Sequence, residues 1–446
     1  MTVMRKLVTT AAQLGLAIIP LAFSGIAQCE ENPFSKWAAA QAVPIATVEP
    51  GKDVQDLLPL TSVVGTADVV ALGEPMHGAH EPMAFRNRLF RFLVEQMGFT
   101  AIAVETGFSE SSSVNWFVSG AQGEAQSHLR TALGRHAENY ELIHWMRDHN
   151  GAAAAAGHHG IRFYGIDLTN GGGAGGPRRV IDYALVYLSR ADPREADRIR
   201  LSLGDSLPPS DDRTFGMLPQ NALQELDDTL PKIATAMAKN RSDLIAHSSV
   251  DAYRWALHNI EVGRQLAKCF HVTTPKSFQD IRYSTPVMNC RDRAMADNVA
   301  WIATNEGSKG RVLVFAHDGH IMNWKEDGPR MAQVPDKPFM MGFHLRRALG
   351  KRLVIIAMSS ATTSPGLPTP HPAEDGIDEA LARVGLPRML LDLRLARQDP
   401  AALAWLSRPH LLFGETNALI TPLIAVDAFV FVDRLTPAIG SPDEAH

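Results

Sequence analysis

Four short apolar segments of this sequence each end at a side chain that can act as an acid, a base or a ligand. They are VVALG before Glu74, AIAV before Glu105, FYGI before Asp167 and VLVFA before His317. Enzymes move protons with carboxyl and imidazole groups, and both also bind metal ions. Runs of this length and composition are typical of strands buried on both faces of a parallel sheet. Because such strands end at one edge, the sequence predicts a single hydrolytic or metal-assisted site there.

The first strand end leads into the segment ALGEPMHGAHEPMAFR, residues 71–86. His77 lies in a loop between glycines, and Glu81 and Arg86 lie on the helix that follows. A carboxylate such as Glu74 beside a loop histidine fixes its tautomer and raises its basicity. That arrangement suits a general base that deprotonates water. The alternative is a turn histidine that packs against the sheet edge, with Glu81 capping the helix.

The last strand end continues as VFAHDGHI, where His317 and His320 are three residues apart. Both side chains can face the same crevice, as a second base, as hydrogen-bond donors to a transition state or as metal ligands. Two histidines without a third fixed ligand are a weak zinc pattern. A structural role fits His320 as well as a catalytic one.

The elements that must position these residues alternate between strand and helix from Asp68 to His317. The pattern predicts strands over 68–73, 100–105, 161–167, 311–317, 352–360 and 428–435, and helices over 81–98 and 138–150 with an Ala/Gly loop after the second. Over residues 177–305 the pattern predicts helices and no strand. The fold class is therefore α/β: a mostly parallel central sheet flanked by helices, with a large helical insertion that forms a wall or lid of a pocket.

Composition narrows the possible partners. The chain has 446 residues, 45% of them hydrophobic and 20% charged, with a formal net charge of -5. The absence of any Lys/Arg cluster argues against nucleic acid and against an anionic membrane surface. The oligomeric state is not readable from these features.

The first 27 residues predict a secretory signal peptide. Arg5 and Lys6 precede a long apolar run, and small residues lead to an expected cleavage after Ala27. An uncleaved anchor is the alternative, although the run contains Pro20 and is short for a spanning helix. Lipidation of Cys29 is a further alternative. We expect an exported protein, periplasmic or secreted, with one domain over residues 28–446 and no stable membrane insertion after cleavage.

Three cysteines are too few for a cysteine-based metal site. Cys269 and Cys290 are the pair that would close a compact local loop, and export would permit a disulfide there. Two buried free thiols are an equal alternative.

Six motifs together resemble the erythromycin esterase family. GEPMHG, IAVE, WMRDHN, FYGID, RDRAMADN and VFAHDGHI follow one another in the family's order across residues 68–325. The resemblance implies an α/β core with a helical portion. It also implies hydrolysis of an ester or lactone by a histidine-activated water, with a macrolide as the best-known substrate.

The resemblance assigns roles to individual residues. It makes His77 the general base, with Glu74 beside it, Glu105 at the next strand end, Arg86 on the first helix and His317 in the H-N-x-H motif. We further expect Asp167, Arg291 and His320 to contact the substrate; Asp292 follows Arg291 in the R-D-x-x-M-A-x-N helix. Two departures weaken the inference to macrolides. Asp318 replaces an asparagine, which would change the charge around His317, and Pro75-Met76 replace smaller residues, which would reshape the pocket floor.

The sequence also lacks the motifs of two other kinds of hydrolase, which agrees with this chemistry. The sequence has no G-x-S-x-G nucleophile motif and no H-E-x-x-H zinc motif. GDSL at 204–207 lies in a polar stretch between helices, and GGGAGG at 171–176 predicts a flexible active-site loop after Asp167. The helical insertion and the segment FMMGFHL suggest a large, partly apolar substrate.

The sequence therefore predicts an exported hydrolase of a small-molecule ester or lactone that needs no cofactor. A divalent-metal hydrolase built from Glu74, His77, Glu105, His317 and His320 is the first alternative. A non-catalytic binding protein for a cell-envelope ligand is the second.

Overall fold

The computed structural model describes residues 32–51, 53–129, 132–214, 216–308, 310–369, 373, 375–414 and 417–440. An eight-stranded sheet runs through the centre of this part of the chain, in the order β1-β8-β11-β6-β2-β5-β3-β4. Its strands are β1 Val43–Pro44, β2 Val69–Glu74, β3 Ala101–Gly107, β4 Arg162–Asp167, β5 Val312–His317, β6 Leu353–Ser359, β8 Arg388–Asp392 and β11 Ala428–Val432. The six strands from β11 to β4 are parallel, whereas β8 is antiparallel to both β11 and β1.

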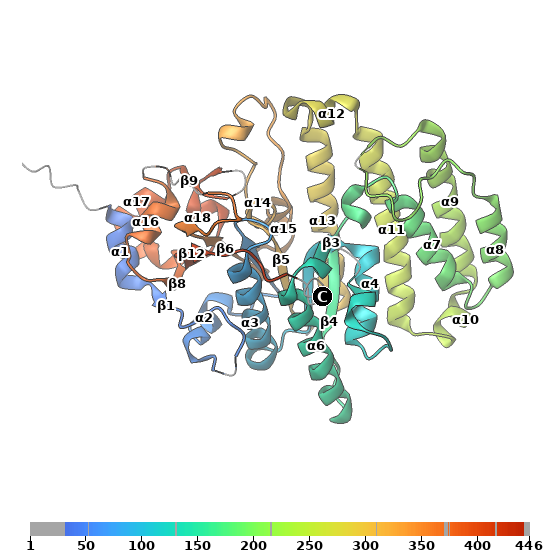
Figure 1. Cartoon of the computed structure of the whole chain (residues 1–446), viewed down its shortest axis with the longest axis horizontal. Coiled ribbons are helices and arrows are strands. Elements are labelled where there is room, and N and C mark those ends of the chain that lie inside the picture. The colour runs from blue at the N-terminus through green and yellow to red at the C-terminus, as the bar shows by residue number, and fades with distance from the viewer. Residues whose placement is uncertain are drawn as a thin grey trace, which may run out of the picture.

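Alternate residues of the central strands face two different hydrophobic cores. In β2, for example, Val69 and Ala71 belong to one core, and Val70 and Leu72 belong to the other. Successive side chains of a strand point to opposite faces, so a continuous apolar run is what a sheet covered on both faces requires. Helices therefore pack on each face of the sheet (Figure 1).

One face is covered mainly by α2 Leu60–Val64, α3 His80–Met97 and α6 Ala137–Ala155. Helix α3 ends at Gly98, whose φ of +70° is a left-handed conformation that glycine adopts without strain. The chain then enters β3 directly. The short connections from β2 to α3 and from α3 to β3 hold the loop that carries His77 at the edge of the sheet.

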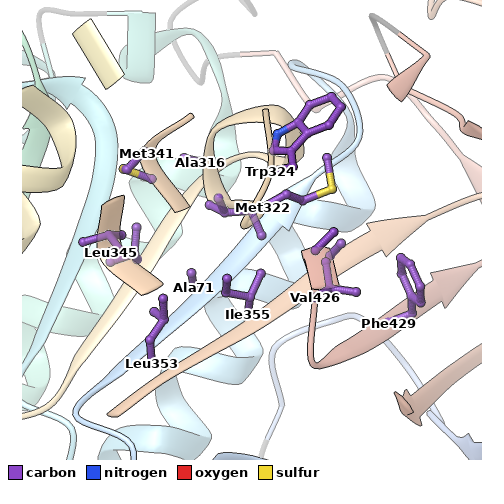
Figure 2. Packing of buried hydrophobic residues seen from close by; sticks show 14 of the residues in the cluster. Ala71, Ala316, Met322, Trp324, Met341, Leu345, Leu353, Ile355, Val426 and Phe429 are labelled. Carbon is purple, nitrogen blue, oxygen red and sulfur yellow. The ribbon is translucent and has the colours of Figure 1, made fainter. Parts of the chain in front are cut away.

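The other face is covered by α1 Pro33–Gln41, α13 Thr285–Asn305, α15 Met341–Leu349, α16 Ile377–Ala382 and α17 Pro400–Leu406. Figure 2 shows how Met341 and Leu345 of α15 pack beside Leu353 and Ile355 of β6. These methionine and leucine side chains are fully or almost fully buried. The Met-rich segment FMMGFHL, residues 339–345, therefore contributes mainly to the core.

The helical insertion forms a third core of its own. The helices of the insertion before α13 are α7 Gly176–Leu188, α8 Pro193–Ser202, α9 Gln220–Lys239, α10 Arg241–Ala246, α11 Val250–Val272 and α12 Pro275–Gln279. Figure 1 shows α7 to α11 gathered at one end of the molecule, opposite α1, α16 and α17. A disulfide between Cys269 and Cys290 joins α11 to α13. Of the two alternatives for these cysteines, the structure contains the disulfide.

The remaining elements are short. They are α4 Phe108–Val118, α5 Ala125–His128, α14 Asp318–Ile321, α18 Pro422–Ala425, β7 Thr362–Thr363, β9 His410–Leu412, β10 Ala418–Ile420 and β12 Arg434–Leu435. None of the helices that the structure describes has the length and apolar character needed to span a bilayer. The predicted signal peptide and Cys29 lie outside the described residues.

The predicted fold class is confirmed, with local corrections. Helix α6 continues to Ala155, through the alanines that we expected to form a loop. Alanine has the highest helix propensity, so the run extends the helix and ends it only where Gly157 follows. Strands β1 and β8 were not predicted. They are short and lie toward one edge of the sheet, where the sequence carries little periodic signal.

Candidate active site

The carboxyl ends of β2, β5, β3 and β4 lie next to one another at one edge of the sheet. Glu74 and His317 are directly opposite each other in the register of β2 and β5. Asp167 ends β4 opposite Gly107, the last residue of β3. Together with Glu105 on β3, the four strand-end residues predicted from the sequence thus share one edge.

Glu105 lies in a bulge of β3. Val104 pairs with Gly165 of β4, and the next pair is Gly107 with Asp167, so β3 has one residue more than β4 over this stretch. Bulges re-aim side chains and are frequent beside active sites. The sequence pattern alone does not reveal this irregularity.

The Glu105 carboxylate is held by positive charge and by the backbone. Its Oε2 accepts a hydrogen bond from the N–H of His317 at 2.9 Å, and its Oε1 accepts one from Nη2 of Arg291 at 2.9 Å. Burial alone would raise the pKa of Glu105, but the positive charges of His320 and Arg291 lower that pKa well below its ordinary value. Glu105 is therefore an anion at neutral pH.

His77 and Glu74 form a hydrogen-bonded pair at the centre of this edge. Nδ1 of His77 lies 2.6 Å from Oε1 of Glu74. The Glu74 side chain is buried, whereas 53% of the His77 side chain is exposed. Burial raises the pKa of Glu74, and the hydrogen bond from His77 opposes that rise. Because the carboxyl oxygen accepts the Nδ1 proton, Nε2 is the nitrogen that can take a proton from a bound molecule.

Arg291, near the start of α13, links two strand ends. Its Nε donates to Oδ1 of Asp167 at 3.0 Å and its Nη2 donates to Oδ2 of Asp167 at 2.8 Å. The same Nη2 reaches Glu105. A guanidinium matches a carboxylate in this two-point geometry better than an ammonium does. The last helix of the insertion, α13 Thr285–Asn305, is thereby fixed to β3 and β4.

His320 lies between two carboxylates. Its Nδ1 is 2.7 Å from Oδ1 of Asp292, and its Nε2 is 3.4 Å from Oε1 of Glu105. Burial alone would lower the pKa of His320, but Asp292 and Glu105 raise it to about 10. The ring is therefore a cation near neutral pH and donates from both nitrogens, so its 3.2 Å approach to Nη1 of Arg291 is a contact between two donors. A group in this state cannot serve as a base.

The ring nitrogens of His317 are both engaged by the backbone. The N–H of Gly319 donates to Nδ1 at 3.1 Å, and Nε2 then carries the proton and donates to the carbonyl of Pro75 at 3.2 Å. The ring centroids of His317 and His77 are 5.3 Å apart. His317 thus ties the end of β5 to the loop that carries His77.

Arg86 is buried beneath the site on α3. Its Nε and Nη2 donate to Oδ1 of Asn87 at 3.0 and 2.8 Å, and its guanidinium carbon lies 4.9 Å from the centroid of the Phe315 ring. Burial lowers the pKa of Arg86 to about 10, although the charge of Glu74 opposes this. The guanidinium is therefore still positive near neutral pH.

The two departures from the family's pattern lie behind the site. Oδ1 of Asp318 accepts a hydrogen bond from the N–H of Met358 at 3.2 Å. Burial raises the pKa of Asp318 well above its ordinary value, which opposes the negative charge that this carboxyl would bring near His317. The side chain of Met76 is fully buried.

A cavity of about 540 Å³ opens above these residues. Six of the predicted site residues line it, namely Glu74, His77, Arg86, Glu105, Asp167 and Arg291. His317 and His320 are not among the lining residues and lie behind those that form the cavity wall. Apolar contact surface comes from Met83, Val104, Leu133 and Phe315.

Sequence reasoning missed the polar residues of the cavity's rim. They are Arg135, His136, Asn139 and Arg213. Asn139 lies in the first turn of the predicted helix, and the other three lie on segments that carry no periodic pattern. Asn170 and Gly171 also line the cavity, so the glycine-rich segment after Asp167 does border the site, as predicted. From the insertion 177–305, Arg213 and Arg291 line the cavity, which makes the insertion part of its wall.

The GDSL segment takes no part in the site. Ser206 donates a hydrogen bond to Glu225, and the N–H of Gly204 donates to the same carboxylate at 2.5 Å. These residues belong to the loop between α8 and α9 and do not line the cavity. The serine is fixed structurally.

Within the described ranges, no group of three or more His, Cys, Asp or Glu side chains is arranged to hold a metal ion. Glu105 faces Arg291, and the ring nitrogens of His317 face the backbone. The cavity instead offers one accessible imidazole paired with a carboxyl, beside fixed positive charge. That combination can deprotonate a water molecule and stabilise an oxyanion.

Comparison with known proteins points to one family. Residues 94–435 match the family model described as erythromycin esterase. Erythromycin esterase type II of Escherichia coli is 26% identical over 343 residues, which cover 73% of this chain and 77% of the relative. Glu74, His77 and Arg86 precede the residues that the family model matches.

The fold is shared with several solved structures. A Bacillus cereus protein superimposes with a TM-score of 0.76 at 24% identity and covers 92% of this chain and 98% of its own. An erythromycin esterase mutant in its open conformation gives a TM-score of 0.63 at 18% identity, with 89% and 98% covered. At these identities the likeness establishes the architecture.

Proposed function

Because the chain belongs to the erythromycin esterase family, we propose that it hydrolyses a carboxylic ester or lactone by direct attack of a water molecule that His77 activates. The hydrogen bond between His77 and Glu74, with the imidazole exposed to the cavity, is the observation that carries this proposal. Buried carboxyl groups orient catalytic imidazoles in this way, so that one nitrogen is committed and the other is basic.

The reaction uses one water molecule to break one ester bond. Nε2 of His77 removes a proton from water as the oxygen attacks the carbonyl carbon, and the carbonyl oxygen becomes an oxyanion. Arg291 and Arg86 supply positive charge at the cavity wall for this oxyanion. The intermediate then collapses, the C–O bond to the leaving group breaks, and His77 returns the proton to the departing alkoxide.

The other residues position this machinery. We assign Glu74 to orienting His77, and Glu105 and Asp167 to holding Arg291. We assign His320 to fixing Glu105 through its positive charge, and His317 to fixing the loop of His77 through the Pro75 carbonyl.

The proposed activity is tested with purified protein and a panel of esters, simple lactones and macrolides. Macrolides are included because the Escherichia coli relative is an erythromycin esterase. Mass spectrometry should detect a product that has gained one water molecule from at least one lactone, or an acid and an alcohol from an ester. Absence of turnover across the panel would contradict the proposal.

We also propose that residues 1–27 are removed on export and that residues 28–446 form the mature domain in the periplasm or outside the cell. The disulfide between Cys269 and Cys290 supports this, because such bonds persist in oxidising compartments. N-terminal sequencing of the protein from a fractionated native host tests the idea. A mature chain that begins at Met1 would overturn it.

A further inference from the structure

Residues 436–440 lie beside two segments that line the active-site cavity. One is the loop of His77 and Gly78, and the other is the stretch 133–139 at the start of α6. We call residues 436–440 the C-terminal segment. None of them lines the cavity, so any effect that they have on the reaction must pass through the residues that they contact.

The C-terminal segment is bonded to the loop of His77 through the backbone. The N–H of Ala438 donates to the carbonyl of Gly78 at 2.8 Å, and the N–H of His80 donates to the carbonyl of Thr436 at 2.9 Å. Two of the three residues that follow His77 are therefore held by hydrogen bonds to this segment.

Glu81 binds the C-terminal segment and does not cap its helix. Its Oε2 accepts a hydrogen bond from the N–H of Thr436 at 2.7 Å, and its Oε1 accepts one from the hydroxyl of Thr436 at 2.8 Å. Ala79, at the N-cap position of α3, provides no side-chain cap. The Glu81 carboxylate thus joins the first turn of α3 to the C-terminal segment.

The same segment is bonded to the start of α6. The N–H of Ala137 donates to the carbonyl of Ile439 at 3.0 Å, and the N–H of Ile439 donates to Oε1 of Glu138 at 3.0 Å. That oxygen also lies 2.6 Å from Nδ1 of His80. The hydrogen bond with Glu138 raises the pKa of His80 to about 9, against the effect of burial, so an ion pair links α3 to α6 beside the segment.

We propose that the C-terminal segment is a positioning element of the active site, which keeps His77 aligned with Glu74 and fixes the loop of His77 relative to the start of α6. This inference rests on the proposed function. Loops hold catalytic groups less precisely than strands do, and a displacement of about 1 Å can lower a rate about 100-fold. The hydrogen bond to Glu74 orients the imidazole ring, whereas the C-terminal segment holds the backbone that carries it.

Loss of one side-chain contact tests the proposal. Thr436→Val deletes the hydroxyl that donates to Glu81, and Thr436→Ser keeps it. We expect kcat of Thr436→Val to fall about three- to tenfold with KM changed less than about twofold, because a catalytic group is displaced while binding is retained. Thr436→Ser should restore most of kcat. Thr273→Val is the matched control and should keep full kcat, because the half-buried Thr273 hydroxyl donates to the Cys269 carbonyl outside the cavity.

Loss of one backbone contact is a second, independent test. Ala438→Pro removes the N–H that donates to Gly78, since proline has none. We expect kcat to fall about tenfold, again with little change in KM. The melting temperatures of Ala438→Pro and Thr436→Val should stay within a few degrees of wild type. A kcat that is unchanged in both variants would overturn the inference and would leave the proposed hydrolysis untouched.

Nuclear magnetic resonance of His77 tests the inference even if none of the esters is cleaved. In protein labelled with ¹⁵N in the histidine rings, the signals that disappear in His77→Asn report which ring nitrogen of His77 carries the proton. At a pH where the ring is neutral, wild type should carry it on Nδ1, toward Glu74. Thr436→Val and Ala438→Pro should show a mixture of the two tautomers. A His77 signal that is the same in both variants as in wild type would overturn the inference.

Discussion

Arg291 binds Asp167 through two parallel hydrogen bonds, Nε to Oδ1 at 3.0 Å and Nη2 to Oδ2 at 2.8 Å. The pair joins α13 to the end of β4, and Nη2 also reaches Glu105 on β3. One guanidinium therefore bridges two carboxylates, and His320 supplies a second positive charge beside Glu105. The position of the helical insertion and the charge of the active site depend on the same side chain.

Replacing Arg291 should affect both stability and turnover. Arg291→Met leaves Asp167 and Glu105 without their shared cation, which we expect to cost about 2 kcal/mol of unfolding free energy, because the pair is partly open to the cavity. Turnover should fall at least about tenfold. Denaturant unfolding and steady-state kinetics measure the two effects, with Arg198→Met as the control. An Arg291→Met protein of unchanged stability would contradict this role.

His320 should make stability fall at alkaline pH. In the unfolded chain a histidine titrates near pH 6.5. In the folded protein burial opposes the proton, but Asp292 and Glu105 raise the pKa of His320 to about 10. A raised pKa contributes stability that is fully present below about pH 6.5 and is lost as the pH rises through about 10.

The melting temperature should therefore decline between about pH 7 and pH 10, and it should decline less steeply in His320→Gln. His158→Gln, at an exposed histidine after α6, is the control and should follow the wild type. Parallel curves for His320→Gln and wild type would show that His320 is not the titrating group.

The disulfide should stabilise the packing of α11 against α13, the helix of the insertion that covers the sheet. Cys269 and Cys290 are 21 residues apart, and closing a loop of this size contributes about 3 kcal/mol in the chain-entropy model. Reduction, or the double variant Cys269→Ala/Cys290→Ala, should lower the melting temperature by several degrees. Adding reductant to the double variant should change nothing further. A reduced wild type with an unchanged melting temperature would contradict this expectation.

Chelation should leave turnover unchanged. In the proposed mechanism His77 activates the water, and Glu105 and Asp167 are engaged by Arg291. Incubation with EDTA followed by gel filtration should give the activity of the untreated enzyme. Loss of activity that added Zn²⁺ or Mn²⁺ restores would instead support the metal-dependent alternative.

The sequence predicted the parts of the site that follow strand periodicity. Apolar runs that close on Glu74, Glu105, Asp167 and His317 define parallel strands, and the ends of parallel strands meet by geometry. The loop position of His77, between glycines after the first run, was readable in the same way. The central sheet is confirmed for this reason, and the described residues of the insertion 177–305 contain no strand.

Other features depend on tertiary contacts that carry no local pattern. Arg135 and Arg213 reach the cavity because backbone segments dock against Asn139 and Gly175. Burial raises the pKa of Asp318, whereas the pKa of His320 is raised, against the effect of burial, by the charges of Asp292 and Glu105. The segment FMMGFHL has the composition of an apolar binding surface, yet Met341 packs in the core beside the sheet (Figure 2).

The rate of water attack in a His77 variant tests the central claim most directly. His77→Asn keeps a polar group that can still donate a hydrogen bond to Glu74 but has no nitrogen that can accept a proton, so kcat should fall about 10²- to 10⁴-fold on the best ester while the melting temperature stays near that of wild type. His158→Asn, the matched exposed control, should keep full activity. A folded His77→Asn protein that retains more than about a tenth of the wild-type kcat would contradict the account.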